Sequence, residues 1–529
     1  MLNHKEEKMK GLFKATLIVT IFSVLTRAMG FVLRIILSRV LGAEILGYYQ
    51  VAMSVFGVLL TLVASGLPLV VSRTVAYKKQ VQDYRGAHAS VTAGLIVTLA
   101  ISILVSAVLY IFPSILTKIF NNNVTTGIVL YSLPAIIASA IYCVLRSALW
   151  GGRRFFAMSF TEFFEQVARI ILCFILFAPG VLPFLSLGEK ASLSLSISCV
   201  MSCLLVIIIY FALKDRLANP RGAFKPLLKS STPITVVRSA SSVVTSLIAL
   251  IIPARLMLYG FTESQAMAEF GMVMGMAFPL IMIPGTLISS LAVALVPEIS
   301  SKTSNIDDKT STRDLDGLKS HVNLAINVSL AISMIFVPAF FVLGTPICEI
   351  LFGSSGAGIY VSRAAIIMIP MGISQITSSL LNSMGLEMKS LINYVISAIA
   401  LFLCIFFLPK YLGTNALIVG MGSLSTISAV LNLRMLKKRN LFAKGFGKFF
   451  IKILGYGAVS GVAGTLLLEL LKLFLPKFVY TVIVGIVCVL IMFLFYFMFD
   501  VAHIRGFVLR KARKNKQNSM QTGDEKSAI

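Results

Sequence analysis

Two arginines, Arg27 and Arg34, lie inside the first long apolar segment of the chain. At about 100° per residue, they share one helix face with Ser23, Gly30 and Ser38, and the other faces are apolar. A guanidinium near the bilayer centre costs about 2.5 to 3.5 kcal/mol. This stripe therefore predicts a helix that lines a wet or anionic space, where arginine binds phosphate oxygens through paired N–H donors.

An alternative interpretation is open for Arg34, whose long side chain could extend to the outer membrane interface. Arg27 lies deeper in the segment, so the same explanation suits it less well. We take both as candidate substrate-binding residues of a central cavity, together with Ser23.

The seventh apolar span carries a second stripe of this kind around Arg238. Thr235 and Ser242 lie on the same helix face, within about 120°. Arg238 is the lone cation in the middle of its span. We therefore expect Arg238, Thr235 and Ser242 to line the same cavity as the first stripe.

A charge pair is predicted on the fifth span, where Glu165 precedes Arg169 by four residues. This spacing and order favour contact on one helix face, which Glu162 joins. Within a membrane such a pair is either a structural clamp or a substrate contact. We expect a clamp, because loss of one partner would leave the other charge buried and unpaired.

Groups that catalyse reactions or hold metal ions form no motif. The four histidines are scattered, and no glycine-rich phosphate loop followed by lysine occurs. Cys199 and Cys203 share a helix face, but two thiols do not complete a metal site. The aspartates between Ser300 and Ser320 are interleaved with basic residues, as in a solvated connector. We expect no enzyme activity, no metal ion and no cofactor.

Composition places the chain in a membrane. Of its 529 residues, 57% are apolar and 13% are charged, with a mean hydropathy of +0.92. Soluble domains carry about 25% charged residues. Apolar stretches of about 20 residues recur along the whole chain, so we predict an all-α polytopic protein with about 14 transmembrane helices. Pro279 and Pro284 predict a kink in the eighth span.

The net charge of +26 reflects topology and not nucleic-acid binding. If the N-terminus is cytoplasmic, 35 of the 47 lysines and arginines fall on the cytoplasmic side, eight fall outside and four lie within spans. This alternation follows the positive-inside rule. It predicts a multi-pass protein with both termini in the cytoplasm and a basic face toward anionic membrane lipids.

Echoes between spans suggest an internal repeat. Arg39 precedes the stretch 47–53, and Arg255 precedes the similar stretch 268–274. Together with the two arginine stripes, they predict two six-helix lobes of parallel topology, an architecture of alternating-access transporters. We predict an N-lobe at 1–218, a C-lobe at 219–440, two additional helices at 441–510 and a basic polar tail at 511–529.

The motifs of the first 300 residues resemble the stage V sporulation protein B family. This family comprises polysaccharide-exporter-type members of the MOP (MATE-like) superfamily, related to MurJ-type lipid II flippases. The resemblance is carried by Thr26-Arg27-Ala28-Met29-Gly30-Phe31-Val32-Leu33-Arg34, by Ser65-Gly66-Leu67-Pro68, by Val144-Leu145-Arg146, by Glu165-Gln166-Val167-Ala168-Arg169 and by Leu295-Val296-Pro297-Glu298-Ile299-Ser300.

This resemblance implies a MOP-type fold and a flippase that moves an undecaprenyl-diphosphate-linked saccharide across the bacterial plasma membrane. The saccharide would be a lipid II-like precursor or a polysaccharide unit, used in spore cortex or cell-wall synthesis. Arg27 matches a cavity arginine of MurJ-type flippases, whereas the position of Arg34 aligns there with an acidic residue. Arg255 and Glu298 are secondary candidate contacts.

The runner-up function is a MATE-type multidrug antiporter coupled to a cation. The helix-one carboxylate of many drug-exporting MATE proteins has no counterpart here, which weakens that interpretation. The resemblance leaves Na+, H+ and the membrane potential open as energy sources. It implies a monomer whose partners are a lipid-linked oligosaccharide and cell-wall synthesis enzymes.

Overall fold

The computed structural model describes residues 2–292, 312–442 and 446–499, and this part of the chain contains helices and no strand. Packing divides the chain into two compact units, Met1–Gly275 and Met276–Ile529. Each is described by itself.

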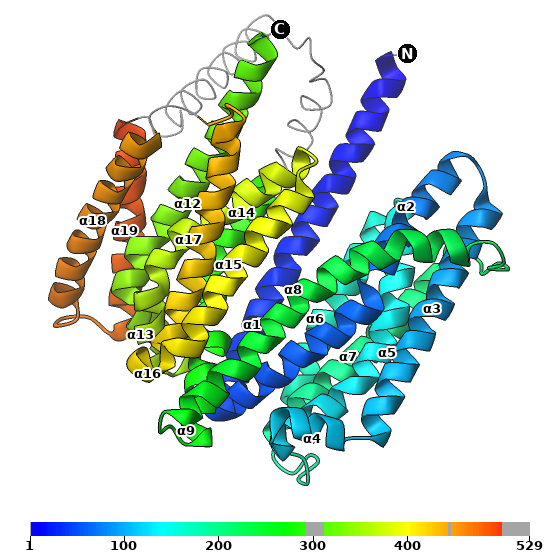
Figure 1. Cartoon of the computed structure of the whole chain (residues 1–529), viewed down its shortest axis with the longest axis horizontal. Helices are drawn as coiled ribbons and strands as arrows, with labels where there is room; N and C mark the ends of the chain where they lie inside the picture. The colour runs from blue at the N-terminus through cyan, green and yellow to red at the C-terminus, as the bar shows by residue number, and fades with distance from the viewer. Residues whose placement is uncertain (1, 293–311, 443–445, 500–529) are drawn as a thin grey trace, which may run out of the picture. The chain divides into compact units, whose positions relative to one another are not determined.

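Nine α-helices make up the N-terminal unit (Figure 1). Helix α1, which carries the first arginine stripe, packs against α5, α6, α7, α8 and α9. The helices are α1 (Leu2–Ala64), α2 (Gly66–Gln80), α3 (Tyr84–Ile111), α4 (Ser114–Phe120), α5 (Asn123–Gly151), α6 (Phe155–Phe177), α7 (Leu187–Ala212), α8 (Phe224–Leu258) and α9 (Glu263–Phe270).

A π-helical turn, η1 (Gly271–Ala277), leads into the second unit. Its long helix α12 contacts α13, α14, α18 and α19. The elements are α10 (Phe278–Ile281), the helix Ile283–Ala292, α12 (Thr312–Phe352), α13 (Ser355–Ala364), η2 (Ala365–Ile367), α14 (Met368–Ser383), α15 (Glu387–Phe407), α16 (Pro409–Leu412), α17 (Asn415–Lys438), α18 (Phe446–Leu471) and α19 (Lys477–Met498).

The predicted number of spans is confirmed to within the uncertainty of their ends. Among the described residues, eleven helices, or twelve if a bent pair counts as one span, are long and apolar enough to cross a membrane. The first, Ile18–Gln80, is broken at Gly42, whose φ of 70° lies in the left-handed region that favours glycine. It thus supplies two spans, and the charged α6 supplies one more. The total is about fourteen.

The bent pair confirms the kink expected from prolines in the eighth span. Its two parts, Glu263–Ile281 and Ile283–Ala292, meet at 43°. Pro279 and Pro284 flank the break. Proline removes a backbone donor and clashes with the preceding turn, so the helix bends there.

The two similar stretches of the proposed repeat lie against each other in the N-terminal unit. A Cβ added to Gly47 of α1 would lie 2.0 Å from the backbone oxygen of Met267 in α9. A Cβ added to Gly271 would lie 2.0 Å from the backbone oxygen of Ala43. The two contacts are reciprocal, and each requires glycine because the partner atom is backbone.

Packing groups α8 and α9 with the N-terminal unit, because α8 contacts both α1 and α2. The compact units therefore divide at 275/276, whereas the lobe boundary at 218/219 rests on sequence repetition and stays a prediction. The two divisions measure different properties, contact in space and similarity along the chain.

Buried polar side chains link the spans of the second unit. Asn432 of α17 is fully buried and donates to Thr377 Oγ1 at 3.2 Å and Ser378 Oγ at 3.0 Å on α14. Its Oδ1 accepts from Asn393 of α15 at 2.9 Å. Within lipid there is little hydrophobic drive between helices, so such hydrogen bonds help to define their pairing.

Candidate functional site

The first half of α1 lies along α6, and aromatic packing sets their alignment. The ring of Phe22 meets the rings of Phe160 and Phe163 edge-on, at centroid distances of 6.5 and 5.9 Å. Two turns further, a Cβ on Gly30 would lie 3.8 Å from Oε1 of Gln166. The arginine stripe of α1 therefore runs beside the charged residues of α6.

Both arginines of the α1 stripe are exposed on the protein surface. Among the described residues, the Arg27 guanidinium has no ion-pair or hydrogen-bond partner, and Ser23 beside it is half-buried. Arg34 interacts electrostatically with Tyr49, which is buried. Arg27 thus keeps its five N–H donors available for a ligand.

On α8, two residues of the polar stripe pack against neighbouring helices and the third is exposed. Ser242 shares a hydrogen bond of 2.7 Å with Thr61 of α1, and Thr235 lies directly over Gly66 of α2. Arg238 is exposed, and its Nη1 lies 3.5 Å from the backbone oxygen of Ser65. The hydroxyls of Thr235 and Ser242 thus face neighbouring helices. The Arg238 guanidinium has N–H donors that do not take part in the contact with Ser65.

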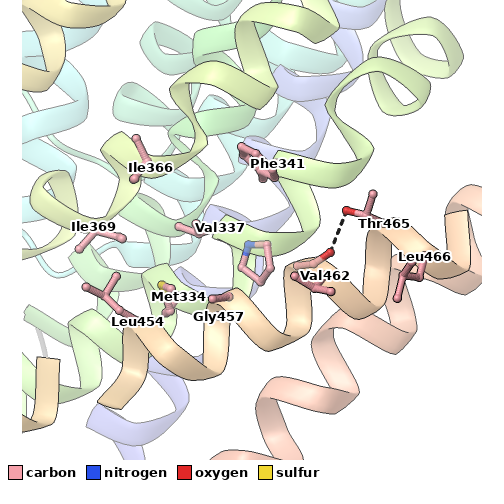
Figure 2. Close-up of a pocket in the computed structure, with 13 residues that line it drawn as sticks. Met334, Val337, Phe341, Ile366, Ile369, Leu454, Gly457, Val462, Thr465 and Leu466 are labelled. Carbon is pink, nitrogen blue, oxygen red and sulfur yellow. Dashed lines mark hydrogen bonds between the residues drawn. The ribbon is translucent and has the colours of Figure 1, made fainter. Parts of the chain in front are cut away.

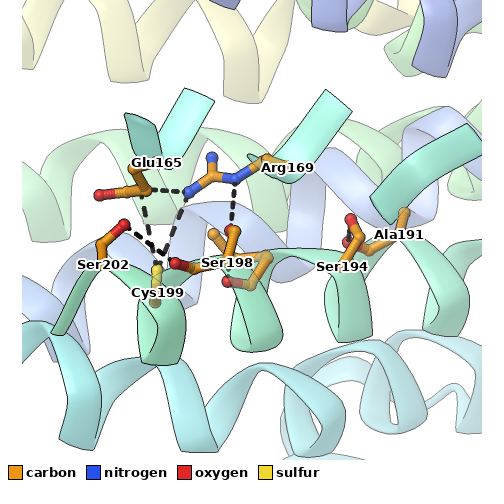
Figure 3. Close-up of polar contacts among 8 residues, drawn as sticks. Glu165, Arg169, Ala191, Ser194, Ser198, Cys199 and Ser202 are labelled. Carbon is orange, nitrogen blue, oxygen red and sulfur yellow. Dashed lines mark hydrogen bonds and ion pairs between the residues drawn. The ribbon is translucent and has the colours of Figure 1, made fainter. Parts of the chain in front are cut away.

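Glu165 and Arg169 form an ion pair on α6, with Oε1 and Nη2 2.6 Å apart (Figure 3). The helix α7 completes their surroundings. Arg169 Nε donates to Ser198 Oγ at 3.2 Å, and the Cys199 sulfur lies 3.8 Å from both charged groups. The side chains are only 16% and 17% exposed, so each charge depends on its partner.

A second ion pair escaped the sequence analysis. Arg146 of α5 pairs with Glu162 of α6 through Nη2 and Oε2. The sequence places Arg146 near the end of an apolar span, among the basic residues of the predicted cytoplasmic side. Its partner is 16 residues away on another helix, so helical spacing alone does not reveal the pair.

We call this set of side chains the arginine belt, and it carries more positive than negative charge. It comprises five arginines and two glutamates of the N-terminal unit, and two of the arginines, Arg146 and Arg169, pair with the glutamates. Among the described residues, no cluster of histidine, cysteine or carboxylate side chains could hold a metal ion. The chemistry of the belt suits reversible binding of an anion. Its members are Arg27, Arg34, Arg146, Glu162, Glu165, Arg169 and Arg238.

Of the two secondary candidates, the structure describes one, Arg255. Arg255, near the end of α8, donates to the Tyr259 hydroxyl at 2.7 Å and also lies over that ring. Glu298 lies outside the residues that the structure describes.

The second unit contains two adjoining apolar cavities of about 510 and 490 Å³, which share Ile366, Ile369 and Leu454. The first lies between α12 and α18 (Figure 2). The other lies between α14, α17 and α18. We call them together the apolar groove. Only a threonine hydroxyl in each interrupts the apolar side-chain lining, so the groove suits a hydrocarbon chain.

The many apolar spans indicate a multi-pass membrane protein, and its helices share the fold of solved structures of MOP superfamily and MurJ proteins. The chain belongs to the polysaccharide biosynthesis protein family, whose model matches residues 12–303. The family and fold expected from the sequence motifs are thereby confirmed.

Three similar proteins support this assignment. Stage V sporulation protein B of Bacillus subtilis (strain 168) is 24% identical over 400 residues, which are 73% of this chain and 75% of that protein. The solved structure of lipid II flippase MurJ in an inward closed conformation has a TM-score of 0.66 at 16% identity, covering 91% of this chain and 99% of that one. An inward-facing multidrug resistance MATE family transporter of the MOP superfamily has a TM-score of 0.65 at 16% identity, with 78% and 94% covered.

Proposed function

We propose that the protein is a flippase that moves an undecaprenyl-diphosphate-linked saccharide across the bacterial plasma membrane. The observation that carries this proposal is the arginine belt, in which Arg27 stands unpaired among the described residues. The lipid II flippase MurJ, which shares the fold, is named for a substrate of this class.

The headgroup chemistry follows from charge. A diphosphate leaving water loses its hydration, and a guanidinium can replace it with charge-assisted, often bidentate hydrogen bonds. The half-buried Ser23 provides a further donor beside Arg27.

The apolar groove of the second unit has a lining suited to a polyprenyl chain. Its lining of branched aliphatic and aromatic side chains resembles the interior of a bilayer more than a polar binding site. A polyprenyl tail can therefore stay in contact with apolar surface while its headgroup crosses. The groove uses α18, one of the two helices outside the proposed repeat.

The runner-up, a cation-coupled multidrug antiporter, predicts a binding surface of opposite sign. A cationic drug needs carboxylates or aromatic faces. Both glutamates of the belt are already paired with arginines. The arginine belt therefore favours the anionic lipid.

We further propose that both termini are cytoplasmic, that the protein acts as a monomer and that an ion gradient of Na+ or H+, or the membrane potential, drives transport. The excess of basic residues on one predicted side supports the orientation.

Binding to the purified protein tests the function. Arg27→Ala removes charge-assisted hydrogen bonds worth about 1.5 to 3 kcal/mol. We expect affinity for a fluorescent undecaprenyl diphosphate to fall roughly tenfold to more than a hundredfold. Arg27→Lys should retain part of the affinity, because lysine keeps the charge and loses the planar fork.

Arg221→Ala is the matched control, since Arg221 is exposed in the linker before α8 and lies outside the belt. It should bind the lipid like the wild type. The same titrations include a cationic dye. If Arg27→Ala binds the lipid normally, the mechanism is wrong, and if the wild type prefers the dye, the antiporter replaces the flippase.

A further inference from the structure

The two ion pairs of α6 lie in different surroundings. Glu165 and Arg169 are enclosed and share further partners on α7, as described above. In the other pair, the Arg146 and Glu162 side chains are 31% and 43% exposed. A charge exposed to hydrocarbon would be costly, so we place the open edge of this pair toward a water-filled interior.

Arg146 has a hydrogen-bonding capacity that this pair does not use. Its Nε is buried and has no acceptor among the described residues. A buried donor without an acceptor lowers the stability of a protein by about 1 to 3 kcal/mol, and such donors are rare in native proteins. Only Glu162 accepts from Arg146 within the described part of the chain. The guanidinium is therefore incompletely satisfied by the protein alone.

The backbone around the pair is well anchored. One turn before Arg146, the Tyr142 hydroxyl lies 3.4 Å from Thr161 Oγ1 of α6, and both residues are buried. This contact sets the register of α5 against α6. The pair can thus exchange a partner by moving side chains, while both helices stay in place.

The pair also lies beside the candidate site. The stretch 22–30 of α1, which contains Arg27, runs along the stretch 160–166 of α6, which contains Glu162. Arg27 and Glu162 therefore belong to neighbouring stretches of two packed helices.

We propose that Arg146 and Glu162 form an exchangeable counter-ion pair, in which a phosphate group of the substrate displaces Glu162 from Arg146. This inference rests on the proposed function and adds two residues to it. Arg146 is a binding residue. Glu162 is a positioning residue that holds Arg146 in the empty protein and competes with the anion, which limits affinity and favours release.

Farnesyl diphosphate is a suitable probe, because it carries the same headgroup on a short chain, and farnesol is its uncharged counterpart. Purified full-length variants are titrated with both. Glu162→Gln removes the competing charge, so we expect farnesyl diphosphate to bind about fivefold tighter and farnesol to bind unchanged. Glu469→Gln is the control, since Glu469 is an exposed carboxylate of α18 that also pairs with a basic residue.

Arg146→Gln should weaken farnesyl diphosphate about tenfold or more, and Arg146→Lys should recover part of this loss. If Arg146→Gln fails to fold, the double variant Arg146→Gln/Glu162→Gln removes both charges and keeps the test decisive. The double variant should have a melting temperature close to that of the wild type. Its affinity for farnesyl diphosphate should be reduced about tenfold or more, as expected for Arg146→Gln.

Any one of three results would overturn the exchange. Glu162→Gln could leave the affinity for farnesyl diphosphate unchanged, or it could lower both that affinity and the melting temperature. The third result is that the neutral double variant binds farnesyl diphosphate like the wild type. In these cases Arg27→Ala still reports on the proposed function separately. If the wild type binds farnesyl diphosphate no better than farnesol and also fails to bind undecaprenyl diphosphate, both proposals fall.

Discussion

Arg169 is the most fully coordinated arginine of the belt. Its guanidinium contacts a carboxylate, a hydroxyl and a thiol, drawn from α6 and α7. A charge enclosed in this way is tolerated because the surrounding groups replace its hydration. Its Nε and Nη2 donors are engaged, so Arg169 has fewer donors to offer a ligand than Arg27 has.

We therefore predict that Glu165 and Arg169 act as a structural clamp. Glu165→Gln leaves an enclosed cation without its counter-charge, which costs about 3 to 5 kcal/mol in buried pairs. Abundance and melting temperature should fall, and Glu165→Gln/Arg169→Gln should restore part of both. The measurement is thermal unfolding of the purified variants, followed by size-exclusion chromatography. A single variant as stable as the wild type and inactive in transport would place the pair in the substrate path.

Helical spacing predicted the contact between Glu165 and Arg169, because neighbours on one helix face follow from sequence alone. It did not reveal the partner of Glu162, since Arg146 belongs to another helix. The same limit applies to Thr235 and Ser242. Periodicity placed them on one face of the helix, but that they pack against Thr61 and Gly66 depends on tertiary structure.

At the level of elements, glycine sets how closely α18 approaches its neighbours. A Cβ on Gly457 would lie 2.0 Å from the terminal methyl of Met334, and one on Gly464 would lie 2.5 Å from the Cys488 sulfur. Gly461 lines the first cavity of the groove, and the nearest atom to an added Cβ would be 3.9 Å away, on Pro338. A side chain at Gly461 therefore has room to enter the groove without displacing a helix.

We predict that Gly461→Leu blocks the groove while the protein folds normally. The leucine side chain occupies part of the 510 Å³ cavity, so transport of a long-chain lipid-linked substrate should fall about tenfold or more. The measurement is flipping in proteoliposomes. Binding of farnesyl diphosphate, whose chain is short, should change less.

Gly455→Leu is the control on the same helix, because no atom lies within 4 Å of a Cβ placed there and Gly455 does not line the groove. It should transport like the wild type. Equal loss in both variants would mean that α18 is sensitive to glycine replacement in general and that the groove does not hold the tail.

The element pattern was predictable where it depends on composition alone. Apolar stretches long enough to cross a bilayer indicated about fourteen spans, and prolines indicated the bend of the eighth. The break at Gly42 falls between the first two predicted spans, near 12–37 and 46–71, but the left-handed φ of this residue depends on context. The groove was also beyond prediction, because it arises where α12, α14 and α18 meet.

For the whole molecule, the uneven distribution of basic residues is the main indication of orientation. The predicted cytoplasmic side carries 35 lysines and arginines and the other side eight, and the electrical and lipid asymmetry of the membrane favours this arrangement. The same basic surface explains a net charge of +26 in a chain with no nucleic-acid motif.

We predict that loops alternate in accessibility along the chain, with both termini cytoplasmic. In a cysteine-free background, single cysteines replace large exposed side chains, so that folding is not disturbed. Phe184, Tyr411 and Phe474 are 76%, 75% and 75% exposed and lie in predicted outer loops. Tyr77 and Met388, at 67% and 65%, lie near predicted cytoplasmic loops.

An impermeant thiol reagent added to intact cells should label the first three positions and spare the other two, and permeabilised cells should label all five. The comparison controls for reactivity, because each cysteine is its own reference after permeabilisation. Reversal at two or more positions would invert the orientation or change the number of spans. An inverted orientation would also reverse the side of the membrane from which the substrate is proposed to enter.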